Sequence, residues 1–187
     1  MRMSQADKEK SHARIVAGAS RLLRERGLDG ASVDEMMKAA GMTHGGFYKH
    51  FDSKEALIVA AIDAAFASFA EPLEQGEPER AVTAYRALYL SEGHKTHPGI
   101  GCPVASLGPD IGRAPERLKA AFGAGVQRIV AALARARKGS AAAREAAAFR
   151  EASMLVGAMV IARASDPATA RAVLAACKQP YASRVAE

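Results

Sequence analysis

Apolar residues along this chain recur every three or four positions, which is the spacing of one face of an α-helix. The stretch with Ile15, Ala19 and Leu22 shows this pattern, which stops at Gly27, a residue suited to end a helix. No segment alternates Val, Ile or Thr with polar residues as a strand does, and no repeat of fixed period occurs. The sequence therefore predicts an all-α fold of about nine helices.

Caps, glycines and prolines set the limits of the expected helices. Ser32 with Glu35 has the spacing of a capping box, and Ser140 is another N-cap candidate. Pro72 and Pro180 are expected to end helices. The first expected helix ends at residue 27. The others are expected over residues 33–40, 43–50, 52–72, 77–89, 104–111, 115–139, 140–164 and 167–180. The Gly- and Pro-rich stretch from 93 to 112 is expected to be a loop that contains one of them.

Composition limits the classes of function without choosing among them. The 187 residues are 49% hydrophobic but only 5% aromatic, with no Trp, which suits helices packed through small side chains. A net charge of +6 suits a polyanionic partner. Residues 1–58, however, hold ten Lys and Arg against eight Asp and Glu, so their share is only +2. A nucleic-acid surface must therefore be located by a motif and not by charge.

The first residues and the cysteines predict a cytoplasmic protein. The chain starts directly with charged residues, so we expect no secretory signal. The longest apolar run, residues 154–162, is about half as long as a membrane-spanning helix, so we expect no membrane partner. Cys102 and Cys177 lack the spacing of a zinc site or disulfide scaffold and are expected to be reduced thiols. We expect neither a metal nor another cofactor.

Residues 32–57 carry the pattern that points to a function. They predict two short helices around a turn at Gly41, followed at once by a third helix, which is the spacing of a helix-turn-helix. Four apolar side chains have the spacing to form the small core that joins these helices: Met36, Met37, Phe47 and Phe51. The polar residues between them are left for the outer surface.

The same segment resembles the TetR family of transcriptional regulators. The resemblance rests on a capped helix, Ala40-Gly41, a short helix ending in Phe47-Tyr48-Lys49-His50-Phe51, and then Ser53-Lys54-Glu55, and it covers about residues 11 to 60. It implies a homodimeric repressor that binds a palindromic operator in double-stranded DNA and is released by a small-molecule effector. It also implies a DNA-binding domain over residues 1–56 and a ligand-sensing and dimerisation domain over residues 57–187.

The candidate DNA-binding residues lie on the outer side of the helix-turn-helix. They are Ser32, Thr43, His44, Gly45, Gly46, Tyr48, Lys49, His50 and Lys54. The resemblance implies phosphate contacts by Tyr48, His50 and Lys54, while Thr43, His44 and Lys49 are candidates for base edges. Two adjacent glycines weaken a helix, so close approach of the backbone to DNA is one reason for Gly45-Gly46. The alternative is that they extend the turn and the helix begins later.

Two further sets of residues are expected in the C-terminal part. The helix over residues 140–164 is apolar around most of its circumference, which favours a dimer interface at Phe149, Val156, Met159 and Val160. The alternative is a helix central to its own domain. A ligand pocket is expected at Phe66, Phe69, Tyr85, Tyr89, Cys102 and Phe122, and the alternative is that this set is ordinary core.

Cys102 supports more than one interpretation. Gly101-Cys102-Pro103 resembles a loop of TetR-family members that respond to electrophiles or oxidants, and the alternative is a buried cysteine that only fills space. Cys102 with His94 or His97 is also the one candidate cluster for an enzyme, but the sequence contains no GxSxG, HExxH or phosphate-loop motif. We therefore expect a regulator and not an enzyme. A DNA-binding protein that responds to no ligand is the remaining alternative.

Overall fold

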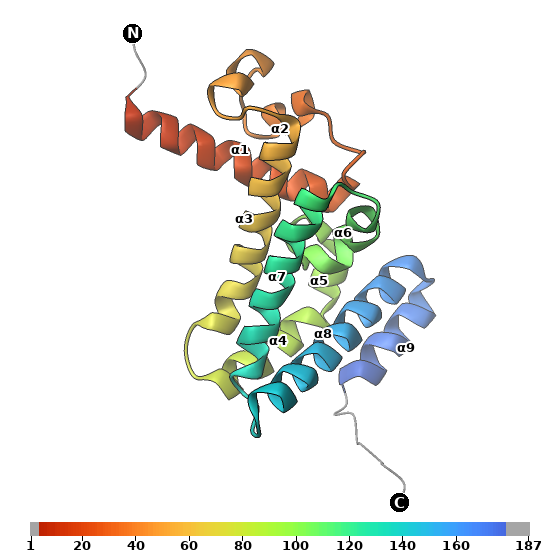
Figure 1. Ribbon diagram of the computed structural model, residues 1–187. Helices are drawn as coiled ribbons and strands as arrows, with labels where there is room; N and C mark the ends of the chain where they lie inside the picture. The colour runs from red at the N-terminus through yellow and green to blue at the C-terminus, as the bar shows by residue number, and fades with distance from the viewer. Residues whose placement is uncertain (1–3, 179–187) are drawn as a thin grey trace, which may run out of the picture. The chain divides into compact units, whose positions relative to one another are not determined.

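The computed structural model describes residues 4–178, and these residues form helices joined by short turns (Figure 1). The elements are α1 (Gln5–Arg26), α2 (Val33–Ala39), the 3₁₀ helix η1 (His44–Lys49), α3 (Lys54–Glu74), α4 (Pro78–Tyr89), α5 (Glu92–Thr96), the 3₁₀ helix η2 (Pro98–Ile100), α6 (Pro103–Gly112), α7 (Glu116–Ala134), α8 (Ala141–Ala164) and α9 (Pro167–Lys178). No described residue lies in a strand. The prediction of an all-α fold is confirmed.

Several helix ends lie where the capping residues place them. Gly27 follows α1 with a φ of 79°, and its N–H donates to the carbonyl oxygen of Leu23. Ser140 caps α8, since its hydroxyl accepts a hydrogen bond from the amide of Ala143. Pro167 begins α9, but the expected end of that helix at Pro180 lies outside the described residues.

The stretch from 93 to 112 is more helical than predicted. It contains the end of α5, the short helix η2 and all of α6, and prolines occupy the first positions of η2 and α6. Proline there lacks an N–H that the first turn of a helix does not use, so these residues start helices instead of preventing them. Two ends also differ: α3 continues past Pro72 to Glu74, and α7 ends at Ala134 instead of Gly139.

The chain divides into two compact units. One contains Met1–Glu71 with His97–Ile129, and the other contains Pro72–Thr96 with Val130–Glu187. Helices α3 and α7 each begin in the first unit and end in the second. Among the described residues, α3 is the one helix whose length and composition would allow it to cross a membrane, but its apolar side chains Leu57, Ile62 and Phe66 lie in the protein core.

The first unit is closely packed where helices cross. A Cβ atom added to Gly18 of α1 would lie 3.1 Å from the backbone of Ala39 and Ala40 at the end of α2. A Cβ atom at Gly125 of α7 would overlap the ring of Phe66 in α3, which is fully buried. Because protein cores tolerate almost no overlap, both glycines permit a close helix approach that a larger residue would prevent.

Two polar contacts in the same unit join α1 to the segment that carries η2 and α6. The buried guanidinium of Arg24 donates from Nη1 to the carbonyl oxygen of Gly101 at 2.9 Å and from Nε to that of Ser20 at 3.1 Å. The amide of Leu28, just after α1, donates to Oδ2 of Asp110 in α6 at 3.0 Å. Burial removes water from the Arg24 guanidinium and lowers its pKa. The carbonyl oxygens of Ser20 and Gly101 replace part of the lost hydration. The end of the first helix is thereby fixed to α6.

The second unit holds α4, α5, α8 and α9, with α8 and α9 packed side by side (Figure 1). Glu151 of α8 is buried and forms ion pairs with Arg86 of α4 and with Arg137, which precedes α8. His94 of α5 is also buried, and its Nδ1 lies 2.7 Å from the carbonyl oxygen of Tyr89. Polar contacts as well as apolar packing therefore hold this unit together.

Candidate nucleic-acid interface

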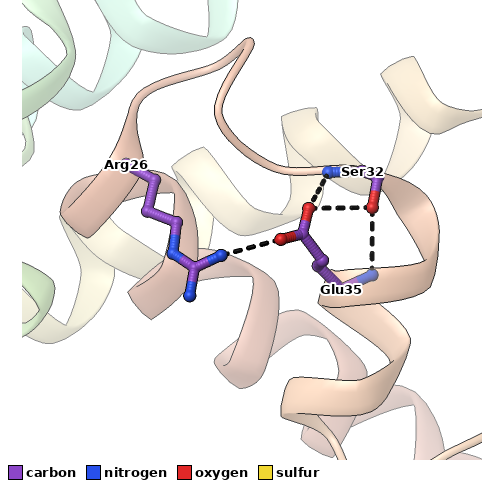
Figure 2. Close-up of polar contacts among 3 residues, drawn as sticks. All are labelled: Arg26, Ser32 and Glu35. Carbon is purple, nitrogen blue, oxygen red and sulfur yellow. Dashed lines mark hydrogen bonds and ion pairs between the residues drawn. The ribbon is translucent and has the colours of Figure 1, made fainter.

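A capping box fixes the start of α2, as Figure 2 shows. The hydroxyl of Ser32 accepts a hydrogen bond from the amide of Glu35 at 3.2 Å, and the Glu35 carboxylate accepts one from the amide of Ser32 at 2.9 Å. Arg26, at the end of α1, donates from Nη1 to the other oxygen of Glu35 at 2.7 Å. The hydrogen bonds from Ser32 and the charge of Arg26 lower the pKa of Glu35. The predicted capping box is confirmed, and it also ties α2 to α1.

The turn after α2 depends on Gly41. Its φ of 69° lies in the left-handed region, which glycine adopts without steric strain. Beside it, Nη2 of Arg14 donates to the carbonyl oxygen of Ala40 at 2.7 Å, so α1 also satisfies the end of α2. The predicted turn at Gly41 is confirmed.

The second helix of the motif, η1, is a 3₁₀ helix and not the predicted α-helix. Thr43 precedes it, but the Thr43 side chain makes no capping hydrogen bond. Gly45 and Gly46 both lie inside η1, so they do not belong to an extended turn. Two glycines and the absence of a side-chain cap both weaken an α-helix at this position. This agrees with the short 3₁₀ helix, whose turns hold fewer residues.

Nothing in the fold itself requires the two glycines of η1. Neither has a positive φ. A Cβ atom at Gly45 would meet no atom within 4 Å, and one at Gly46 would only touch the ends of Met37 and Met42 at 3.6 and 3.8 Å. A glycine pair that packing does not explain is consistent with another molecule approaching this backbone.

The four predicted core residues of the motif are buried, as expected: Met36, Met37, Phe47 and Phe51. The rings of Phe47 and Phe51 lie 6.0 Å apart and nearly parallel. The side chain of Tyr48 points away from this core and is 72% exposed. Inner and outer faces of the motif are therefore as the sequence predicted.

The outer face presents most of the candidate DNA-binding residues. Ser32, Thr43, His44, Gly45, Tyr48, Lys49 and Lys54 are exposed, while Gly46 and His50 are partly buried. Lys54 is the first residue of α3, where the positive end of the helix dipole adds to its own charge. Sequence reasoning missed Asp34 of α2, whose carboxylate contacts Nδ1 of His44. The spacing of ten residues between them gives no periodic signal for that contact.

The six candidate pocket residues are not brought together in one unit. Phe66, Phe69, Cys102 and Phe122 belong to the first unit, and Tyr85 and Tyr89 to the second. The rings of Phe66 and Phe122 lie 5.2 Å apart, and those of Tyr85 and Tyr89 5.5 Å apart. A pocket of about 310 Å³ in the first unit is lined by none of the six. Cys102 stands at the N-cap of α6 and is fully buried.

One residue of the predicted dimer interface must be corrected. Met159 is fully buried within its own chain, so its side chain is not available to a partner. Phe149, Val160 and Ile161 of the same helix are 37%, 39% and 48% exposed, and Val156 is partly buried. The periodicity predicted two apolar faces on α8, but it assigned Met159 to the outer face when it belongs to the inner one.

Comparisons with known proteins agree with this geometry. Residues 15–61 match the family described as bacterial regulatory proteins, tetR family. The transcriptional regulator AcuR of Cereibacter sphaeroides is 31% identical over 123 residues, which are 62% of this chain and 56% of AcuR. The HTH-type transcriptional repressor NemR of Escherichia coli is 27% identical over 128 residues, 65% of this chain and 64% of NemR. The match thus spans less than two thirds of either relative.

Solved structures show the same fold over nearly the whole chain. The reduced form of E. coli NemR has a TM-score of 0.72 at 23% identity and covers 90% of this chain and 95% of its own. A TetR transcriptional regulator from Legionella pneumophila has a TM-score of 0.70 at 19% identity and covers 89% and 94%. Residues 15–61 therefore carry the DNA-binding segment of the tetR family of bacterial regulatory proteins, and the described fold is that of solved TetR regulators.

Proposed function

We propose that this protein is a ligand-responsive transcriptional repressor, which binds a palindromic operator as a homodimer and is released by a small molecule. Residues 1–56 serve as the DNA-binding domain, and residues 57–187 serve for ligand sensing and dimerisation. The observation that carries the proposal is the outer face of η1, where a glycine pair that packing does not require lies beside exposed Tyr48 and Lys49. The name of NemR, a transcriptional repressor, supports repression over activation.

Each candidate residue then has a role in DNA binding. Tyr48, His50 and Lys54 contact phosphates and position the protein, and Lys54 does so from the first turn of α3. Thr43, His44 and Lys49 reach base edges in the major groove, with Lys49 suited to the acceptors of guanine. Gly45 and Gly46 let the backbone come close to the DNA, and Ser32 lies at the exposed start of α2.

The homodimer is supported by α8. Its exposed side includes three large apolar side chains, Phe149, Val160 and Ile161, and large apolar groups exposed together on one helix are typical of an interface. The neighbouring helix α9 packs along α8, and two copies of this helix pair would form a four-helix bundle. Two copies of η1, related by the dimer axis, would then reach two half-sites. The protein acts in the cytoplasm, where such an operator is found.

The effector acts by reversible binding and not by reaction with Cys102. The thiol is fully buried at the start of α6, so this conformation keeps it from an electrophile in solution. Its position near Arg24 instead suits a packing role beside the contact between α1 and Gly101. A protein that keeps its DNA in the presence of every small molecule tested would be a ligand-independent DNA-binding protein instead.

The roles of two lysines give the experiment for this proposal. Lys54→Ala is expected to weaken binding to all DNA sequences alike and to lower the salt dependence by about one charge, because a phosphate contact carries no sequence information. Lys49→Ala is expected to relax the preference at one base position, where a good contact discriminates by about 1–3 kcal/mol. Both are checked by titrating labelled duplexes at several salt concentrations and by comparing base preferences.

The matched control is Arg171→Ala, which removes an exposed charge from α9. It is expected to bind DNA like the wild type. The assignment of roles fails if the Lys49 and Lys54 variants give the same base preferences and the same salt dependence. The whole proposal fails if neither variant differs from the Arg171 variant.

A further inference from the structure

We propose that Lys8 and His12 of α1, together with His50 at the end of η1, form a phosphate-contacting surface that extends the helix-turn-helix interface onto α1, where His50 takes up a proton as DNA binds. This inference rests on the proposed function, because it needs DNA as the partner. It adds a segment of α1 to the interface and a dependence of affinity on pH. Neither follows from the helix-turn-helix pattern.

The three residues are brought together by helix geometry and by ring packing. Lys8 and His12 are four positions apart, so they lie on the same face of α1. The ring of His12 stacks on Phe51 with a centroid distance of 4.6 Å, and its centroid lies 6.2 Å from that of His50. Phe51 is a core residue of the motif, so the stacking holds α1 against the end of η1.

The surface has more positive than negative charge. Lys8 forms no ion pair with any residue that the structure describes, and Lys49 beside His50 forms none there either. The nearest acids in the sequence are Asp7 and Glu9 on α1, which accept hydrogen bonds from Ser4 and Gln5, and Asp52, which is exposed. None of these carboxylates forms an ion pair with His12 or His50 among the described residues. The two histidines and Lys8 are therefore open to an anion.

His50 is the group most sensitive to such an anion. Its Nδ1 is buried and has no hydrogen-bond partner among residues 4–178. Partial burial lowers the pKa of His50, and the positive charges of His12, Lys8 and Lys49 lower it further. In the free protein this ring is thus neutral near pH 7. A phosphate placed beside the rings of His12 and His50 would offset the positive charges around His50 and raise the pKa of His50.

The direction of the pH effect follows from the link between phosphate binding and the pKa of His50. If bound DNA raises the pKa of a histidine, then binding takes up a proton and affinity increases as the pH falls toward the pKa of the free protein. DNA is the partner that fits, because η1, which continues directly into His50, carries the candidate base contacts. A duplex also offers a row of phosphates that can reach α1 and η1 at once.

The first test compares two lysines of α1. The probe is a fluorescent duplex of about 30 base pairs with mixed sequence, since phosphate contacts do not depend on sequence. Lys8→Ala is expected to lower the slope of log affinity against log salt by about one unit. Lys10→Ala removes the same charge two positions away, on another face of α1, and is expected to leave the slope unchanged. Equal slopes for the two variants would overturn the proposal.

The second test measures the affinity of the same duplex at about pH 8 and about pH 6, where a histidine changes charge. The wild type is expected to bind about fivefold more tightly at the lower pH, and His12→Gln or His50→Gln to reduce this to about twofold. His97→Gln, outside the surface, is the control and keeps the full effect. If His50→Gln does not fold, His12→Gln decides between the outcomes, because the His12 side chain is only partly buried.

The outcomes separate this inference from the proposed function. A wild-type protein that binds no duplex at any pH contradicts the proposed function itself. A wild type that binds DNA with the same affinity at both pH values overturns the inference alone. The inference also fails if His44→Gln removes the pH effect while His12→Gln retains it, because the effect would then arise at the contact of His44 with Asp34 and not at this surface.

Discussion

Changing Val160 and Ile161 of α8 to glutamate is expected to convert a dimer into folded monomers and to weaken operator binding by at least about a hundredfold. Both side chains are partly exposed in the single chain, at 39% and 48%, so the change does not disturb its own core. In a dimer the two carboxylates would be buried against apolar groups without a partner, which costs several kcal/mol. A monomer then loses the gain from holding two half-sites at once.

Sedimentation across a range of concentrations measures the effect, with circular dichroism to show that the chain remains helical. Leu88→Glu is the matched control, since Leu88 is also a large apolar residue that is 57% exposed, but lies on α4. It is expected to remain dimeric. Met159 was also expected at the interface, but Met159→Glu would not test it, because this change places a charge in the core of the chain. A double variant that stays dimeric removes α8 from the interface.

Glu151→Ala is expected to lower the free energy of unfolding by about 3 kcal/mol, because it removes one member of a buried ion-pair cluster. The Glu151 side chain is 5% exposed and is the common partner of Arg86 and Arg137. Without it, two guanidiniums face each other with no negative charge between them. Burial and the charge of Arg86 already lower the pKa of Arg137, so this repulsion is present even with the carboxylate in place.

Urea denaturation followed by circular dichroism checks this value. Glu145→Ala removes a carboxylate from an exposed position of the same helix and is expected to change stability by no more than about 0.5 kcal/mol. If Glu151→Ala is also within about 0.5 kcal/mol of the wild type, the cluster contributes nothing measurable.

The sequence predicted those features whose cause is local. The capping box at Ser32 and Glu35, the turns at Gly27 and Gly41 and the buried face of the helix-turn-helix all follow from residues a few positions apart. Local signals were less reliable where the same residues are compatible with two different structures. A Gly- and Pro-rich stretch suggested a loop, yet its prolines occupy first positions of helices, where proline is tolerated.

Long-range contacts could not be predicted from spacing. Arg24 with Gly101, Glu151 with Arg86, and the ring of His12 on Phe51 join residues that are far apart in the chain. Arg24, Arg86 and Glu151 belong to residue types that mostly lie at the protein surface. Met159 shows the same limit on one helix, since an apolar circumference does not say which side faces the chain and which faces a partner.

The central claim is that a two-fold dimer presents two copies of η1 to DNA, and selection from a random pool of duplexes tests it most directly. The account predicts enrichment of an inverted repeat whose half-sites lie at least one helical turn apart, about 34 Å or more between centres. Footprinting of the selected fragment should show protection of both half-sites. Enrichment of a site without dyad symmetry, or no enrichment at all, would contradict the account.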